Sequence, residues 1–117
     1  MNAPLGHHSL FDFKGCDAQR LTDTPFLREN MLAAVKSAGG TIVTDTFHTF
    51  SPHGVSGVVV IAESHVTLHT WPEHGYAAVD VFSCGISLNH DVIATKLTEA
   101  LAAQTVDQRR FARGATA

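Results

Sequence analysis

The stretch GVVVIAESHVTLHTW, residues 57–71, decides the fold of this chain. Its first part, residues 57–62, is a short continuous apolar run of the kind that forms a central strand. Its second part alternates, so that Val66 and Leu68 would share one face of a strand and His69 would lie on the other. We therefore predict two consecutive strands within this stretch.

The remaining segments extend this pattern in both directions. Further strands are expected at residues 5–13, 41–50, 76–82 and 105–113, with a loop at residues 51–57 and a turn at residues 72–75. A first helix is expected to begin at Thr24, because Thr can cap and Pro25 is tolerated in the first turn, and to end at the glycine pair 39–40. A second helix opens at Asn89 or His90. The last few residues are expected to fray.

This order of elements predicts the fold class. A run of strands separates the two helices, which indicates an α+β fold: a two-layer α/β sandwich, with a mostly antiparallel sheet and two helices on one face. The other face would carry Thr67 and His69. A bare face of this kind is either solvated or covered by a second subunit, and we favour the second subunit.

The composition excludes several classes of protein. A chain of 117 residues suits one domain, and no stretch approaches the roughly 20 apolar residues that span a bilayer. A secretory signal and a membrane association are not expected. The net charge of −3 gives no reason to expect nucleic acid. We expect a cytoplasmic protein in which Cys16 and Cys84 are free thiols.

The eight histidines raise the question of a metal site. His65 and His69 are four residues apart, but in a strand such positions lie roughly 13 Å from each other, too far to share one ion. A metal-binding pair with this spacing is a helical device. His7 and His8 are adjacent and add no further argument. We expect no metal site.

The central block of the sequence resembles a known family. Residues 54–65, GVSGVVVIAESH, lead through VTLHTWPE at residues 66–73 into GYAAVDVFSCG at residues 75–85. This block closely resembles the core of the prokaryotic S-adenosylmethionine decarboxylase proenzymes. The segments AGGTIV, residues 38–43, and TFHTF, residues 46–50, resemble the strand that precedes it.

The resemblance implies one domain, residues 1–117, that cleaves itself between Glu63 and Ser64 into a β chain 1–63 and an α chain 64–117. The Ser64 hydroxyl would attack the Glu63 carbonyl and turn the amide into an ester. Removal of the Cα proton would expel the carboxylate, and the resulting dehydroalanine would tautomerise and lose ammonia to leave a pyruvoyl group. This covalent cofactor would form a Schiff base with S-adenosylmethionine and accept the electrons released as carbon dioxide leaves.

The resemblance also implies roles for other side chains. His69 would remove the Cα proton of the ester, and Ser56 would hold the processing intermediate by hydrogen bonding. Cys84 would return a proton to the decarboxylated carbon, a task that suits a thiol with a reference pKa of about 8.5. Phe50 would stack on the adenine, and Glu73 would accept hydrogen bonds from the ribose hydroxyls.

The family's active sites lie at or near a subunit interface, which implies a homodimer of processed αβ protomers. The product would supply aminopropyl groups for spermidine and other polyamines. One point of geometry stands out. Ser64 and His69 have an odd separation and would point to opposite faces of a regular strand. The chain then either bends at Glu63-Ser64, or the two side chains meet through a bulge.

Each of these residues also has an ordinary structural interpretation. Outside this block, a Ser after a Glu is a common turn residue, and a His on a polar strand face is usually solvated. A lone Cys is most often a small buried apolar residue. Phe50 could belong to the core, and Glu73 could be a solvated charge in a turn.

Two departures from the family leave the substrate open. Family members commonly have an Arg where this chain has His7, and acidic residues soon after the pair that corresponds to Cys84-Gly85. One alternative is therefore a pyruvoyl-dependent decarboxylase of a basic amino acid, arginine or ornithine. A second alternative is an uncleaved, non-catalytic homologue that binds a nucleoside-like ligand.

Overall fold

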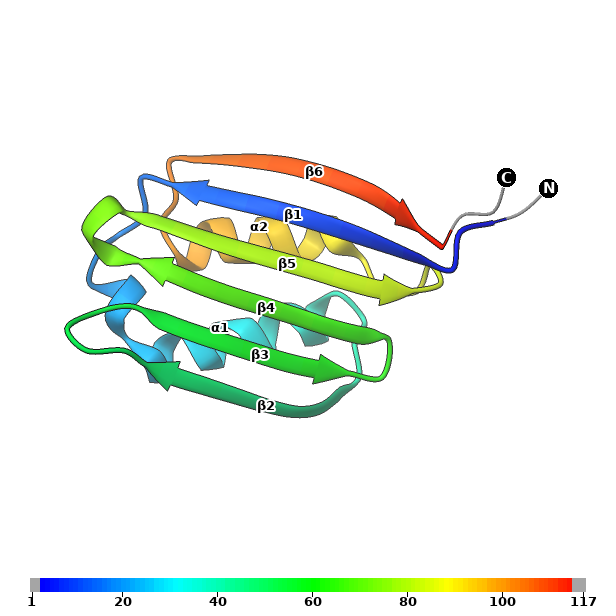
Figure 1. Ribbon diagram of the computed structural model, residues 1–117, viewed down its shortest axis with the longest axis horizontal. Coiled ribbons are helices and arrows are strands. Elements are labelled where there is room, and N and C mark those ends of the chain that lie inside the picture. Colours follow the sequence, from blue (N-terminus) through cyan, green and yellow to red (C-terminus); the bar gives the residue numbers. More distant parts are fainter. Residues whose placement is uncertain (1–2, 115–117) are drawn as a thin grey trace.

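Six strands form one antiparallel sheet in the computed structural model, which describes residues 3–114. The strands are β1 (Gly6–Lys14), β2 (Ile42–Thr49), β3 (Val55–Ile61), β4 (Ser64–Trp71), β5 (Tyr76–Cys84) and β6 (Thr105–Arg113). Their order across the sheet is β2-β3-β4-β5-β1-β6 (Figure 1). The expected fraying of the last few residues concerns residues 115–117, which lie outside the described range.

Two α-helices, α1 (Thr24–Ser37) and α2 (His90–Ala100), and two 3-10 helices, η1 (Arg20–Thr22) and η2 (Pro72–His74), complete the fold. Within residues 3–114, none of the helices is both long and apolar enough to cross a membrane. The side chain of Asn89 caps α2 by accepting a hydrogen bond from the Val92 N–H at 3.1 Å. The expected cap of α1 by Thr24 is wrong: Thr24 is already helical, and the preceding Asp23 accepts from the Phe26 N–H.

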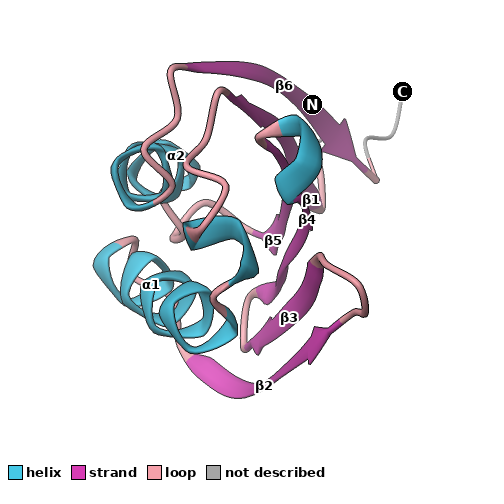
Figure 2. Ribbon diagram, turned by 90° about the vertical axis from the view of Figure 1, so that its left-hand side faces the viewer, coloured by secondary structure: helices cyan, strands magenta, loops and turns pink. Residues whose placement is uncertain are grey.

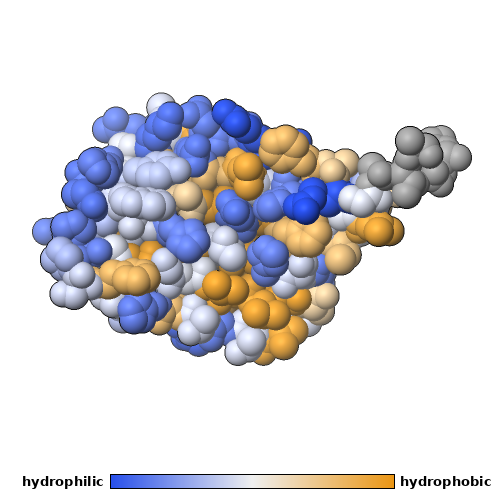
Figure 3. Space-filling model, viewed as in Figure 1, coloured by the Kyte–Doolittle hydropathy of each residue, from blue (hydrophilic) through white to orange (hydrophobic). Residues whose placement is uncertain are grey.

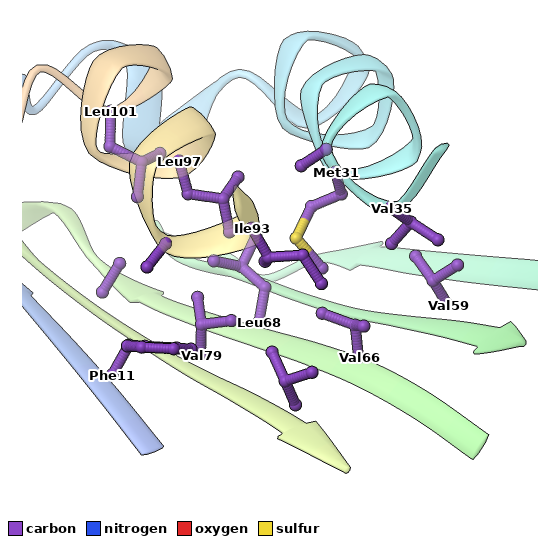
Figure 4. Close-up of a cluster of buried hydrophobic side chains, with 14 of the residues drawn as sticks. Phe11, Met31, Val35, Val59, Val66, Leu68, Val79, Ile93, Leu97 and Leu101 are labelled. Carbon is purple, nitrogen blue, oxygen red and sulfur yellow. The ribbon is translucent and has the colours of Figure 1, made fainter. Parts of the chain in front are cut away.

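Both α-helices lie against the same face of the sheet (Figure 2). Alternate residues of the strands point toward the helices, and side chains at helical spacing point back toward the sheet (Figure 4). Side chains at most 2% exposed fill the space between sheet and helices, among them Phe11, Met31, Val35, Val59, Val66, Leu68, Val79, Ile93, Leu97 and Leu101. The predicted α+β sandwich with two helices on one face is therefore confirmed.

The opposite face of the sheet is uncovered in the single chain. Figure 3 looks onto this face and shows apolar patches among polar side chains. Val60 and Trp71 on this face are 38% and 41% exposed. Ser56 and His69 alternate with buried neighbours along β3 and β4 and so lie on this open face.

The strand limits differ from the sequence prediction at positions that matter for function. β3 begins at Val55, so Ser56 lies in a strand and not in the loop expected over residues 51–57. β4 begins at Ser64, and β5 extends to Cys84. The reason is pairing with neighbouring strands, since Ser56 pairs with His69 of β4 and Ser64 pairs with β5.

Candidate active site

A two-residue turn connects β3 and β4. Ile61 and Ser64 are the last pair of the β3–β4 hairpin, so only Ala62 and Glu63 lie between the strands. Ser64 has a φ of 156°, a positive value that residues with a side chain rarely adopt. The bend expected at Glu63-Ser64 is therefore present, and the backbone there is strained.

Hydrogen bonds hold Glu63 of this turn from two directions. Its carboxylate accepts from the Thr41 N–H at 3.0 Å, and this bond lowers the pKa of the Glu63 carboxyl. Its main-chain oxygen accepts from the Cys84 N–H at 2.8 Å. The carbonyl that a neighbouring nucleophile would attack is thus already polarised by a backbone donor.

Ser64 is half-buried and lies directly opposite Ser83 of β5. The bond from the Cys84 N–H to the Glu63 oxygen flanks this pair, which makes it a non-hydrogen-bonded pair of the ladder. Such pairs bring their Cα atoms to about 4.5 Å and their side chains close together. The Ser64 hydroxyl also makes a long contact of 3.5 Å with Nδ1 of His65.

Cys84 ends β5 and is exposed, and its thiol is free. The chain turns away at Gly85, which has a φ of 69°, a left-handed value that glycine adopts without strain. The Cys84 side chain can therefore meet a ligand, while its backbone N–H contacts the turn before Ser64. The other cysteine, Cys16, is buried and free, and burial raises its pKa to about 11.

A second group of predicted residues lies toward the other end of β4. Ser56 and His69 are paired in register, and Oγ of Ser56 lies 2.8 Å from Nδ1 of His69. A pocket of about 350 Å³ adjoins them. The predicted residues in its lining are Phe50, Ser56, His69 and Glu73, and Trp71 and His53 line it as well.

Glu73 follows Pro72 in η2, at the rim of this pocket. Its own backbone N–H and the neighbouring His53 lower the pKa of its carboxyl, and Nε2 of His53 lies 3.3 Å from Oε2 of Glu73. A carboxylate held in this way can accept hydrogen bonds from a ligand. Phe50 is 48% exposed and packs edge-on against His48, with 4.5 Å between the ring centroids, which leaves part of its surface for a ligand.

The structure does not bring Ser64 and His69 together within one chain. His69 lies five positions after Ser64 in β4, which corresponds to roughly 17 Å in an extended strand. The expected alternative of a bulge is wrong, because β4 pairs with β3 and β5 in an unbroken register. The predicted residues thus form two half-sites: Glu63, Ser64 and Cys84 in one, and Phe50, Ser56, His69 and Glu73 in the other.

Sequence reasoning missed Trp71 and His53 as members of the second half-site. Trp71 stands within the motif that carries the resemblance, and its exposure could have been foreseen from its odd spacing to Leu68. His53 left no such signal, because its contact with Glu73 joins two separate loops. Among residues 3–114, no three His, Cys, Asp or Glu side chains form a group that could hold a metal ion.

Known proteins resemble this chain over nearly its full length. Residues 7–114 match the family model described as S-adenosylmethionine decarboxylase. The chain is 50% identical over 110 residues to an S-adenosylmethionine decarboxylase proenzyme of Acidithiobacillus ferrooxidans, covering 94% of this chain and 83% of that one. A proenzyme of the same name from Thermotoga petrophila is 46% identical, with 94% and 85% covered.

Solved structures agree with this assignment. The adenosylmethionine decarboxylase of Aquifex aeolicus superimposes with a TM-score of 0.90 at 36% identity, over 98% of this chain and 95% of that one. A Trypanosoma brucei AdoMetDC monomer shares the fold alone, with a TM-score of 0.65 at 14% identity over 87% of this chain and 44% of that one. The chain therefore belongs to the S-adenosylmethionine decarboxylase family.

Proposed function

We propose that this protein decarboxylates S-adenosylmethionine with a pyruvoyl group that it makes by cleaving itself between Glu63 and Ser64. The observation that carries this proposal is the 2.8 Å hydrogen bond from the Cys84 N–H to the Glu63 carbonyl oxygen. When the Ser64 hydroxyl attacks this carbonyl, the same N–H stabilises the oxyanion. The unusual φ of Ser64 stores strain of about 1–3 kcal/mol, which the break relieves.

The first step exchanges one bond for another. A bond forms between Oγ of Ser64 and the carbonyl carbon of Glu63, the peptide bond between the two residues breaks, and the hydroxyl proton moves to the new amine of Ser64. Removal of the Cα proton of Ser64 then expels the Glu63 carboxylate, and water hydrolyses the imine tautomer of the resulting dehydroalanine to the pyruvoyl ketone and ammonia. His69 is the base for this second step, and the Ser56 hydroxyl, 2.8 Å from its Nδ1, orients the ring.

The roughly 17 Å between Ser64 and His69 favours a site built from two subunits. Two sheets can pack through their open faces about a two-fold axis, so that His69 of each lies over the backbone at Ser64 of the other, where the Cα proton is removed, while the Ser64 hydroxyl points with Ser83 to the helix-covered side. This arrangement makes two equivalent sites, each with Ser64 and Cys84 from one protomer and Ser56 and His69 of the partner subunit. The exposed Val60 and Trp71 would then be buried between the sheets.

The second half-site offers what a nucleoside needs. Phe50 presents an exposed ring for stacking on the adenine, and the ionised Glu73 accepts hydrogen bonds from ribose hydroxyls. The pyruvoyl group supplies the electron sink for the leaving carbon dioxide. Cys84, exposed next to Ser64, returns the proton to the substrate carbon. This step needs a reduced thiol, which fits a cytoplasmic location.

The relatives support S-adenosylmethionine as the substrate over arginine or ornithine, because they are named S-adenosylmethionine decarboxylase proenzymes. They also support a cleaved enzyme over an uncleaved binding protein, since those relatives are named as proenzymes. The product would serve the synthesis of spermidine and other polyamines.

Denaturing mass spectrometry of the purified protein tests the self-cleavage directly. We expect two chains, 1–63 and 64–117, with a carbonyl at the new terminus that borohydride reduces, whereas Ser64→Ala should remain one chain. Release of labelled carbon dioxide from S-adenosylmethionine, compared with arginine and ornithine, tests the substrate. A wild-type chain that stays whole would refute the proposal, and carbon dioxide from arginine or ornithine instead would refute its substrate.

A further inference from the structure

Three polar side chains form a buried chain of hydrogen bonds beside Ser64. Ser9, Ser83 and His90 are only 0%, 2% and 4% exposed, on the helix-covered side of the sheet. His90, the first residue of α2, uses both ring nitrogens: Nδ1 lies 2.7 Å from Oγ of Ser9, and Nε2 lies 2.7 Å from Oγ of Ser83. None of the steps proposed above involves these three side chains.

The neighbouring groups indicate which side chain donates in each of these hydrogen bonds. Nε of Arg110 donates to Oγ of Ser9 at 3.1 Å, which leaves the Ser9 hydroxyl hydrogen free to be donated to Nδ1 of His90, and we assign it there. The neutral ring then carries its hydrogen on Nε2 and donates to Ser83. Ser83 keeps its own hydroxyl hydrogen to donate further. Burial, followed by the charge of Arg110, lowers the pKa of His90 to about 4, which keeps the ring neutral near pH 7.

The series of hydrogen bonds ends at Ser83, next to the peptide bond that is to be cleaved. Ser83 is the cross-strand neighbour of Ser64, in a close pair whose side chains share one face. The next residue, Cys84, holds the Glu63 carbonyl through its N–H. The position of β5 at this point therefore sets both the neighbour of the nucleophile and the donor to the carbonyl.

We propose that His90 is a positioning residue for self-cleavage, which acts through Ser83 to hold the Ser64 hydroxyl against the Glu63 carbonyl. Once the Ser64 hydroxyl turns from its long contact with His65 toward the carbonyl, Ser83 would donate to its Oγ and leave a lone pair directed at the carbonyl carbon. The contact between α2 and β5 through His90 also fixes the place of the Cys84 N–H. No proton is consumed, because the acyl shift only moves the Ser64 hydroxyl proton to its amine. This inference rests on the proposed function.

A purely structural role would have different consequences. Buried polar groups need partners in any case, and removing one costs stability whether or not it serves a reaction. Removing a positioning residue also slows cleavage, by roughly tenfold to a hundredfold, because small displacements of the reacting groups raise the barrier. Measuring both the rate of cleavage and the stability of each variant therefore distinguishes a structural role from a positioning role.

Ser83→Val and Ser83→Thr are matched variants: their new side chains have nearly the same size, and only that of Ser83→Thr carries a hydroxyl. Cleavage of the full chain, made in a cell-free system and sampled over time, should be at least tenfold slower in Ser83→Val and within about threefold of wild type in Ser83→Thr. His90→Phe should resemble Ser83→Val. Ile93→Val, a truncation in the core contact of the same helix, should lower the melting temperature without slowing cleavage.

Two further readouts identify the step. Hydroxylamine splits an accumulated ester, so it should not rescue Ser83→Val, in which the ester itself forms slowly. In the His69→Ala background, which removes the base of the second step, the rate of ester formation should fall as the pH drops toward 4, because protonation of Nδ1 of His90 breaks the bond from Ser9, and adding His90→Phe should abolish this fall. The other groups facing His90 remain in both proteins: His7 and His8 of β1, Arg110 of β6 and Asp91 of its own helix.

The outcomes are distinguishable. A wild-type chain that never cleaves would refute the proposed function itself. A wild-type chain that cleaves, with Ser83→Val and His90→Phe cleaving as fast as Ile93→Val, would overturn the role of His90 and leave the proposed function intact. If the Ser83 variants do not fold by circular dichroism, the rate of His90→Phe decides.

Discussion

Cys84 contributes two different groups to the proposed reaction. Its backbone N–H holds the Glu63 carbonyl, and its thiol lies exposed for the substrate. Cys84→Ala keeps the N–H and removes only the thiol. We therefore expect this variant to split into two chains as wild type does, while its release of carbon dioxide falls on the order of 10²–10⁴-fold. Normal turnover by Cys84→Ala would remove the thiol from the mechanism.

His90 also makes the stability of the protein depend on pH. Its pKa falls from 6.5 in the unfolded chain to about 4 in the folded chain, chiefly through burial. Between these values the unfolded chain binds the proton and the folded chain does not, so stability is lost as the pH falls from 6.5 toward 4. The loss amounts to about 3 kcal/mol.

Urea unfolding of the uncleaved Ser64→Ala protein at pH 7 and pH 4 measures this loss. Adding His90→Phe to that protein should reduce the difference between the two pH values by about the same amount, because the titrating group is gone. An unchanged pH dependence would show that His90 does not titrate in this range.

At the scale of elements, the edge pair β2–β3 depends on the absence of one side chain. Phe47 and Gly57 are directly paired, and a Cβ at Gly57 would lie 2.2 Å from Cε2 of Phe47. Gly57→Ala therefore has to displace the ring, which packs against the core. We expect it to lower the free energy of unfolding by about 1–3 kcal/mol in the Ser64→Ala background.

A double-mutant cycle checks this cause. Phe47→Leu removes the ring, so Gly57→Ala should cost less in that background than alone, with a coupling of at least about 0.5 kcal/mol. Additive effects would place the cost in the backbone of β3 and not in the ring of Phe47.

The elements themselves could be predicted well from the sequence, because each rests on a local pattern. The alternation around Val66 and Leu68 and the apolar spacing of both helices are properties of neighbouring residues. What the sequence misplaced depends on distant partners. Ser56 lies in β3 because it pairs with His69, and Asp23, one residue before the expected cap, satisfies the start of α1.

The resemblance predicts members for the site, which stay a prediction, but it does not give their arrangement. The resemblance named Ser64 and His69 together, and only the unbroken register of β4 shows that they lie far apart. The chain Ser9–His90–Ser83 joins residues up to 81 positions apart, so no local pattern could reveal it. Tertiary contacts of this kind are absent from any window of the sequence.

At the scale of the whole molecule, the separation of the half-sites and the open sheet face have one explanation. The helices cover one side of the sheet and leave the other side open (Figure 2), and we propose that a second copy covers it. In a two-fold pair, each surface meets itself in the opposite orientation. In the proposed dimer the distance between Ser64 and His69 would be no obstacle, because each residue would work with its counterpart in the other chain.

Mixed dimers test this arrangement. Ser64→Ala cannot cleave, and His69→Ala lacks the base, so each variant alone should yield little of the pyruvoyl terminus. When the two are co-expressed with different tags and purified by both, one of the two sites joins an intact Ser64 to an intact His69 of the partner subunit. We expect the His69→Ala chain of that dimer to be processed while the Ser64→Ala chain stays whole. Because the rescued chain itself lacks His69, its processing requires the base to come from the other subunit. A His69→Ala chain that stays unprocessed in a purified mixed dimer would place Ser64 and His69 in the same protomer, and would then require the β3–β4 hairpin to refold before the pyruvoyl group forms.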